Sequence, residues 1–99
     1  MNRLAQDCAD MTQLRQEIDR LDKELISLFA ERWSYINRAA EIKKPMGLPA
    51  RINERVEEVA RNVRAHADAE NLNPDFYEGL WRQLMEQAIA REEAELGTS

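Results

Sequence analysis

Arg32 and Lys43 are the first residues in this sequence whose types and spacing suggest chemistry. They stand eleven positions apart in a long helical pattern. On a helix this separation is about 20° around the axis and roughly 16 Å along it, so the two cations share a face. Their long side chains can converge on one small anion, and a guanidinium can bind a carboxylate through two hydrogen bonds. The pair therefore suggests an anion site.

Two other charged residues could complete that site. Glu92 continues an apolar helical stripe formed by Tyr77, Trp81, Leu84, Met85 and Ala88. Arg15 lies about 25 Å from Arg32 along the helix and about 100° around it, so it cannot reach the same pocket within one chain. An antiparallel helix from a second chain could deliver it there.

Each of these residues also has an ordinary structural interpretation. Arginines beside an apolar seam often form salt bridges between chains, as Arg15 could do with an acid of a partner. A buried Arg or Glu without a partner costs several kcal/mol, however, and here a seam arginine, a lysine on its face and a stripe glutamate occur together. We therefore favour an enzyme site over a helical interaction module. Binding of a small anion without turnover is a third possibility.

Other kinds of site have little support. His66 is the only histidine and has no Cys or second His at ligand spacing, so no metal site is expected. The sequence contains no nucleophile with an adjacent base and no glycine-rich phosphate loop, and no cofactor is expected. The aromatic residues fall at helical spacings and are predicted to be core, namely Phe29, Trp33, Tyr35, Phe76, Tyr77 and Trp81.

The composition indicates one small folded domain spanning residues 1–99. The chain has 99 residues, 43% of them apolar, and a net charge of −5. An acidic chain is unsuited to nucleic acid or to anionic membrane surfaces, because phosphate binding needs a surplus of Lys and Arg. Cys8 is the single cysteine, and the N-terminus has no apolar run suited to a signal peptide or membrane span. These features predict a cytoplasmic protein.

Three helical segments must position the charged residues. The first is predicted from about residue 10 or 12 to about 44, with Asp10 as N-cap, Gln13 in the capping-box position and Pro45 ending the helix. The second is predicted over about 50–70. The third is predicted to follow the N-cap Asn73 and to end at Gly97. Residues 1–9 and 97–99 are expected to be flexible.

The first helix is too long for a compact monomer. About 33 residues span roughly 50 Å, and the two shorter helices cannot cover that length. Its apolar seam repeats with alternating steps of four and three, and Arg32 occupies the one position that is not apolar. The apolar members are Leu14, Ile18, Leu21, Leu25, Leu28, Tyr35, Ala39 and Ile42. We expect an all-α, intertwined homodimer with three helices per chain. An extended coiled-coil dimer with a helical appendage has the same periodicity.

Three blocks of the first segment resemble a known family. They are residues 14–22 (LRQEIDRLD), residues 28–32 (LFAER) and the pair Ile42-Lys43. These blocks are similar to the opening helix of the all-α chorismate mutases and the related isochorismate-pyruvate lyases. The resemblance covers nearly the whole chain, continuing through Pro49, Asn53-Glu54-Arg55-Val56, Asn71-Leu72, Phe76 and Trp81 to Glu92.

The resemblance implies a role for each charged residue. It implies that Arg15 enters the site from the partner chain and that Arg32 and Arg55 bind the substrate together with it. It implies that Lys43 donates to the ether oxygen of chorismate, and that Glu92 stands where the family has Gln or Glu. The implied reaction, chorismate to prephenate, is an intramolecular rearrangement that needs conformational restraint and charge stabilisation.

Some positions depart from the mutase pattern. Ile52 and Val56 stand where many of the mutases have acids that bind the ring hydroxyl of the substrate, and Ala88 stands where some have serine. The segment from Asp7-Cys8 to residues 18–20 looks rather like the lyase branch, which converts isochorismate to salicylate and pyruvate. We favour the mutase and keep the lyase as the alternative.

Two functional expectations follow from the resemblance. A carboxylate cannot donate a hydrogen bond, so Glu92 must be protonated if it faces the ether oxygen, and activity should weaken as the pH rises. The segment 45–49 follows Lys43 and is expected to close over the site, with higher mobility when no ligand is bound.

Overall fold

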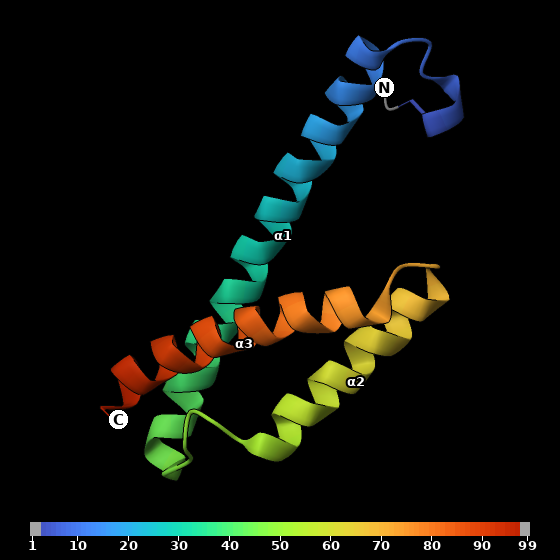
Figure 1. Cartoon of the computed structure of the whole chain (residues 1–99). Helices are drawn as coiled ribbons and strands as arrows, with labels where there is room; N and C mark the ends of the chain where they lie inside the picture. The colour runs from blue at the N-terminus through green and yellow to red at the C-terminus, as the bar shows by residue number, and fades with distance from the viewer. Residues whose placement is uncertain (1–2, 98–99) are drawn as a thin grey trace. The chain divides into compact units, whose positions relative to one another are not determined.

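In the computed structural model, which Figure 1 draws, residues 3–97 fold into three α-helices and one short 3₁₀ turn. The structure describes residues 3–97. The 3₁₀ turn is Ala5–Asp7, and the α-helices are α1 (Met11–Met46), α2 (Asn53–Ala69) and α3 (Pro74–Leu96). No strand occurs among the described residues, which confirms the all-α class with three helices. The intertwined homodimer stays a prediction.

The chain divides into two compact units, Met1–Ser34 and Tyr35–Ser99. The first contains the 3₁₀ turn and the N-terminal part of α1, and the second contains the last turns of α1 with α2 and α3. The single domain over residues 1–99 stays a prediction. Flexibility of residues 1–9 and 97–99 also stays a prediction, and residues 1, 2, 98 and 99 lie outside the described part.

The predicted capping box begins α1. The Asp10 Oδ1 atom accepts a hydrogen bond from the Gln13 backbone N–H at 2.9 Å, which satisfies one of the donors left open at a helix start. In return, the Gln13 Oε1 atom accepts from the Ala9 N–H at 2.8 Å. The return bond therefore reaches one residue further back than in the usual capping box.

The prediction that Pro45 ends the first helix is wrong. Pro45 lies inside the last turn, and α1 continues to Met46. Gly47 ends the helix instead, with a φ of 67°, while its N–H donates to the Lys44 carbonyl at 3.3 Å and the Leu48 N–H donates to Lys43 at 3.1 Å. This pair of bonds is a Schellman motif. Loss of one N–H at the proline does not end a helix when a glycine two residues later completes it.

The second helix starts later than predicted, and the third matches its prediction. Residues 50–52 precede α2, where the Ile52 carbonyl accepts the first bonds from the N–H groups of Arg55 and Val56, both at 3.0 Å. In α3, the Asn73 side chain accepts from the N–H groups of Asp75 and Phe76 at 3.0 and 3.2 Å. Gly97, at φ 73°, follows the last residue of the helix.

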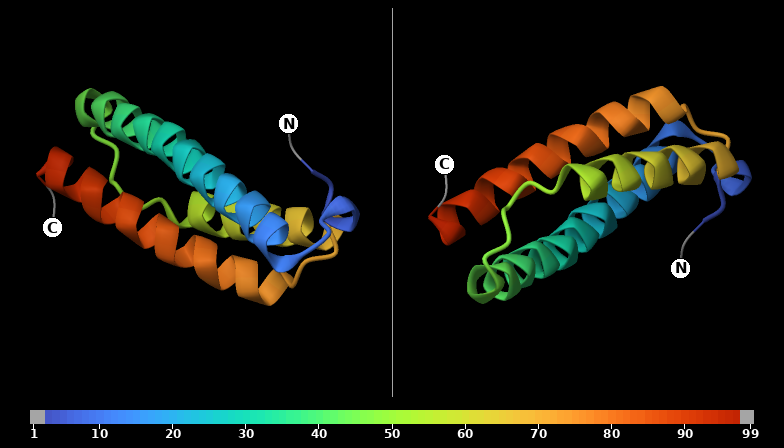
Figure 2. Two further views of the ribbon diagram at one scale, coloured as in Figure 1. Left: turned by 90° about the horizontal axis from the view of Figure 1, so that it is seen from above. Right: turned by 90° about the horizontal axis from the view of Figure 1, so that it is seen from below.

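The core of the second unit consists largely of small side chains. Helices α2 and α3 run antiparallel and side by side in both views of Figure 2. Ala40 from α1 and Ala50 from the segment before α2 are also buried. Small residues at these positions allow close approach of helices. The buried residues on α2 and α3 are Ala60, Val63, Ala67, Met85, Ala88, Ile89 and Glu92.

Much of the apolar seam of α1 is exposed in the single chain. Ile18, Leu21, Leu25, Leu28 and Ile42 all belong to this exposed group. Tyr35 and Phe76 are 69% and 61% exposed, so their prediction as core is wrong for the chain alone.

None of the helices in residues 3–97 has a stretch apolar enough to cross a bilayer.

Candidate functional site

Lys43 and Glu92 meet inside the second unit. Lys43 lies near the C-terminal end of α1 and Glu92 near the C-terminal end of α3, and the Lys43 Nζ and Glu92 Oε1 atoms are 2.8 Å apart. The exposed fractions of the two side chains are 17% and 6%. A charge that leaves water needs a partner of opposite sign, and each of these residues supplies it to the other.

The Lys43 ammonium group has a second contact on the segment that follows α1. It donates a hydrogen bond to the carbonyl oxygen of Ala50 at 2.9 Å. An ammonium group has three N–H donors. With one directed to Ala50 and the positive charge opposite Glu92, a donor is left for an incoming oxygen atom.

Glu92 keeps hydrogen-bonding capacity in spite of its ion pair. Its Oε1 atom is buried and has no hydrogen-bond partner among residues 3–97, because the contact with Lys43 has the length of a hydrogen bond but not its direction. Buried polar atoms are usually satisfied, and exceptions are often found at functional sites. This oxygen can accept a bond from a ligand or, once protonated, donate one.

Among residues 3–97, no hydrogen bond or ion pair brings Arg55 to the Lys43–Glu92 pair. It lies in the first turns of α2, with its side chain 64% exposed, and its Nη1 atom donates to Glu58 Oε1 at 2.6 Å. This is a bond to a residue three positions along the same helix, and such exposed pairs are weak. Arg55 can therefore leave Glu58 at little cost.

Arg15 and Arg32 belong to the first unit. Both lie on α1, where Arg15 is exposed and Arg32 is half-buried. Their membership of the site stays a prediction, as does the entry of Arg15 from a partner chain.

The sequence departs from the mutase pattern that it resembles at Ile52, Val56 and Ala88. These residues lie just before α2, on α2 and on α3. Ile52 precedes α2 in an extended conformation and is half-buried, as is Val56 one turn later. Ala88 is buried on α3, one helical turn before Glu92. The position next to Glu92 on this face therefore carries only a methyl group.

Arg51 and Glu86 form an ion pair that the sequence pattern did not single out. The Arg51 Nη2 atom donates to Glu86 Oε2 at 2.6 Å, which connects the segment before α2 to α3. This hydrogen bond lowers the pKa of Glu86 and raises that of Arg51. The two residues are 35 positions apart, so no helical spacing could reveal the contact.

A larger network of ion pairs joins α2 to α3. Its members are Glu57, Arg64, Asp75, Glu78 and Arg82. Hydrogen bonds from Arg82 lower the pKa values of Glu57 and Glu78, and Arg64 contributes further to the lowering at Glu78. Of these pairs only Glu78–Arg82 joins residues four positions apart on one helix, and the others join residues too distant in sequence for helical spacing to reveal them.

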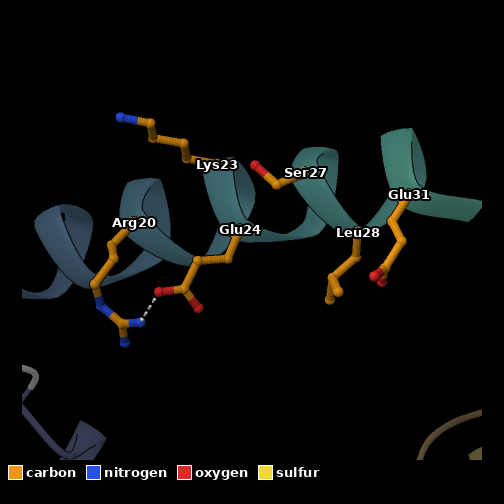
Figure 3. A pocket seen from close by; sticks show the side chains of 6 residues that line it. All are labelled: Arg20, Lys23, Glu24, Ser27, Leu28 and Glu31. Atoms are coloured by element: carbon orange, nitrogen blue, oxygen red, sulfur yellow. Dashed lines mark hydrogen bonds and ion pairs between the residues drawn. The ribbon is translucent and has the colours of Figure 1, made fainter.

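The N-terminal part of α1 lines an open hollow with charges of both signs. Figure 3 shows its lining side chains: Arg20, Lys23, Glu24, Ser27, Leu28 and Glu31. Arg20 already donates to Glu24 at 2.9 Å and to Glu17 at 3.0 Å. All the lining residues come from one helix, so this hollow is a weaker candidate than the Lys43–Glu92 pair. No group of three side chains suited to a metal ion occurs in residues 3–97.

Comparison with known proteins gives one family and several relatives. The model of the family Chorismate mutase type II matches residues 14–93. The T-protein of Enterobacter agglomerans is 33% identical over 84 residues, which cover 85% of this chain and 22% of that protein. The chain thus spans about a fifth of the length of the T-proteins that it matches.

Two shorter relatives match over most of their own length. The isochorismate pyruvate lyase of Pseudomonas aeruginosa is 28% identical over 88 residues, or 88% of this chain and 85% of that protein. The chorismate mutase of Methanocaldococcus jannaschii is 28% identical over 76 residues, or 77% of each chain.

Proposed function

The chain belongs to the chorismate mutase type II family, and on this premise we propose that it catalyses the rearrangement of chorismate to prephenate. The observation that carries the proposal is the buried Lys43–Glu92 pair, at 2.8 Å, formed between the ends of two helices. It supports the proposal because a buried cation with a donor to spare, beside a carboxyl group, suits a reaction in which charge develops on an ether oxygen. We place the reaction in aromatic amino acid biosynthesis.

The chemistry asks little of the protein beyond position and charge. In chorismate the C–O bond to the enolpyruvyl group breaks while a C–C bond forms within the same molecule. No nucleophile and no net proton transfer are needed. The protein can accelerate the reaction by holding the compact conformer and by stabilising negative charge on the ether oxygen as its bond to carbon breaks.

We assign that stabilisation to Lys43 and Glu92. The spare N–H of the Lys43 ammonium group donates to the ether oxygen. Glu92 is the ion-pair partner of Lys43 in the ligand-free chain, and with substrate bound its carboxyl group, in the protonated form, donates beside Lys43. The Lys43 bond to Ala50 supports this role, because it fixes the direction of the ammonium group before substrate arrives.

Three arginines bind the two carboxylates of the substrate in this proposal. Arg32 and Arg55 come from the same chain as Lys43, and Arg15 comes from the partner of a homodimer. Arg55 turns from Glu58 to the substrate, which its exposed and weak pair allows. The exposed apolar seam of α1 supports the dimer, since a second copy would cover side chains such as Leu25 and Leu28.

Isochorismate-pyruvate lyase activity is the second candidate. The P. aeruginosa relative with that name matches over most of both chains. Ile52, Val56 and Ala88 offer no polar side chain for the ring hydroxyl of chorismate, and in isochorismate this hydroxyl is placed differently. The lyase would release salicylate and pyruvate and would share the cations with the mutase.

Incubation with each substrate separately tests both candidates. The purified chain is mixed with chorismate or with isochorismate, and the products are separated and identified. Prephenate from chorismate is the expected result, and salicylate from isochorismate with no prephenate from chorismate would establish the lyase instead. Lys43→Met, with a side chain of similar length and no charge, is the control that should abolish either activity. If neither substrate reacts, the proposed function is wrong.

A further inference from the structure

The position of Lys43 depends on the backbone that follows it. Its ammonium group donates to the carbonyl of Ala50, seven residues further along the chain. Ala50 is only 4% exposed and lies in the connecting segment, residues 47–52, between α1 and α2. A shift of this segment would therefore move the carbonyl and redirect the donors of Lys43.

Backbone hydrogen bonds hold both ends of the connecting segment. At its start, Gly47 and Leu48 complete the end of α1. At its end, the Ile52 carbonyl accepts the first two bonds of α2. These contacts bind the segment to the helices that it joins, but not to α3, which carries Glu92.

Arg51 supplies a side-chain connection to α3. It follows Ala50 directly, and its guanidinium donates to Glu86 at 2.6 Å. Glu86 and Glu92 lie six residues apart on α3, roughly 9 Å along the axis. One rigid helix thus carries both the acid that faces Lys43 and the acid that holds the segment beside Ala50. The negative charge of Glu93 also raises the pKa of Arg51, by less than the hydrogen bond to Glu86 does.

We propose that the Arg51–Glu86 ion pair positions Lys43 for reaction by fixing the Ala50 carbonyl against α3. The proposal rests on the proposed function. Arg51 and Glu86 are then positioning residues that never touch the substrate. The ammonium group of Lys43 has three N–H donors, and the bond of one of them to the Ala50 carbonyl sets the directions of the other two. When the pair is broken, Lys43 still faces Glu92, but its donor is no longer fixed toward the ether oxygen.

Kinetic measurements on Arg51→Gln and Glu86→Gln test the proposal. Both variants should lower kcat several-fold with little change in KM, because misplacement of a donor weakens the transition state more than substrate binding. The charge-exchanged double variant Arg51→Glu/Glu86→Arg should recover much of the lost kcat. A raised KM in Arg51→Gln alone, with Glu86→Gln unaffected, would overturn the proposal, since it would mean that Arg51 binds substrate directly.

Arg64→Gln is the matched control. The Arg64 side chain is 43% exposed, close to the 42% of Arg51, and it also bonds acids of α3, Asp75 and Glu78. It has no contact with the connecting segment among the described interactions. Its loss should leave kcat unchanged. An equal loss of kcat in Arg64→Gln and Arg51→Gln would overturn the proposal by showing that any ion pair to α3 has the same effect.

Hydrogen exchange in the ligand-free protein gives a readout that does not depend on turnover. Amides of residues 47–52 should exchange several-fold faster in Arg51→Gln and Glu86→Gln than in the wild type, and at the wild-type rate in Arg64→Gln. Unchanged exchange in the first two variants would overturn the positioning role. An inactive wild type would contradict the proposed function instead, so the two failures are distinguishable.

Discussion

At the level of single residues, the ion pair between Lys43 and Glu92 compensates the loss of hydration of both charges. Each loses water contact on folding, and the 2.8 Å ion pair offsets much of that loss. The same balance makes the pair responsive to an anionic ligand, because substrate brings an oxygen that competes for the ammonium group. Removal of one partner leaves the other charge buried and unpaired.

Lys43→Met should therefore destabilise the protein by about 3 kcal/mol, since it leaves the Glu92 carboxylate buried without a cation. Urea unfolding measures this loss. The double variant Lys43→Met/Glu92→Gln should recover most of it, because the amide removes the unpaired charge while keeping the shape. Equal stability of the single and double variants would contradict the importance of the pair.

Substitution of Glu92 tests its proposed role as a hydrogen-bond donor. An ionised carboxylate accepts hydrogen bonds but cannot donate them, whereas the amide group of glutamine can do both. If position 92 donates to the ether oxygen, Glu92→Gln should retain most of the wild-type kcat, which steady-state kinetics with chorismate measures. A large loss of kcat in this variant would rule out a donor role for Glu92.

At the level of the elements, Gly47 decides where α1 ends. Its φ of 67° is in the left-handed region, which a side chain disfavours, although a Cβ there would meet no other atom within 4 Å. Gly79 lies inside α3 with an ordinary helical backbone and equally open surroundings. Substitutions at the two glycines therefore differ in backbone strain but not in steric contact of the added Cβ atom.

Gly47→Ala should cost about 1 kcal/mol of stability, whereas Gly79→Ala should add about 0.5–1 kcal/mol because alanine favours a helix. Thermal or urea unfolding of both variants checks the opposite signs. A stabilising Gly47→Ala would mean that α1 does not end in a left-handed residue.

The ion pairs between α2 and α3 should make stability depend on pH in acid. Arg82 lowers the pKa values of Glu57 and Glu78 below the ordinary value of 4.5 in the folded chain, and Arg64 lowers that of Glu78 further. The ion pairs of Glu57 and Glu78 therefore contribute their full stabilisation to the folded state above pH 4.5. This stabilisation is lost as the pH falls from 4.5 through the lower pKa values that the two carboxyl groups have in the folded chain. High salt should weaken it as well, because these side chains are at the surface.

Melting temperatures measured from pH 7 down to below 4.5 test this dependence. Arg82→Gln removes the main cause of both lowered values and should reduce the decrease in Tm on acidification. Arg38→Gln is the control, since its ion pair with Glu41 joins neighbours on α1 and does not connect helices. Identical pH dependence in Arg82→Gln and the wild type would contradict the network's role.

The whole molecule leaves apolar surface that one chain does not cover. Leu28 and Tyr35 are 60% and 69% exposed on α1, and neighbouring seam positions are similar. A run of exposed apolar residues along 36 residues of helix is unusual in a monomer and typical of a surface that pairs with a copy. In the proposed dimer, the partner contributes Arg15 as well as burial.

Mixed dimers test this sharing of residues between chains. Arg15→Ala and Arg32→Ala should each be nearly inactive alone. When equal amounts are unfolded and refolded together, about half of the dimers contain one chain of each kind, and each of these has one intact site. About a quarter of the wild-type activity should return. Sedimentation of the mixture confirms the dimer mass, and no recovery in a mixture of dimers would contradict the entry of Arg15 from the partner.

Local features of the chain were readable from the sequence. The helical periodicity predicted three helices, and the side chains of Asp10 and Asn73 marked two helix starts correctly. These features depend on contacts within four residues, which spacing reveals. The prediction that Pro45 ends the first helix was wrong because Gly47, two residues later, adopts the left-handed conformation that ends α1 after Met46.

The sequence by itself determined the helices, the unusual charged residues in their apolar stripes and, through the matching blocks, the family. Only the tertiary structure decided that Lys43 pairs with Glu92 and bonds to Ala50, and that Arg51 connects the adjacent segment to α3. The physical reason is that these contacts join residues whose separation in sequence has no fixed relation to distance. Helical spacing determines on which face of a helix a residue lies. Its charged partner on another helix is determined only by how the helices pack.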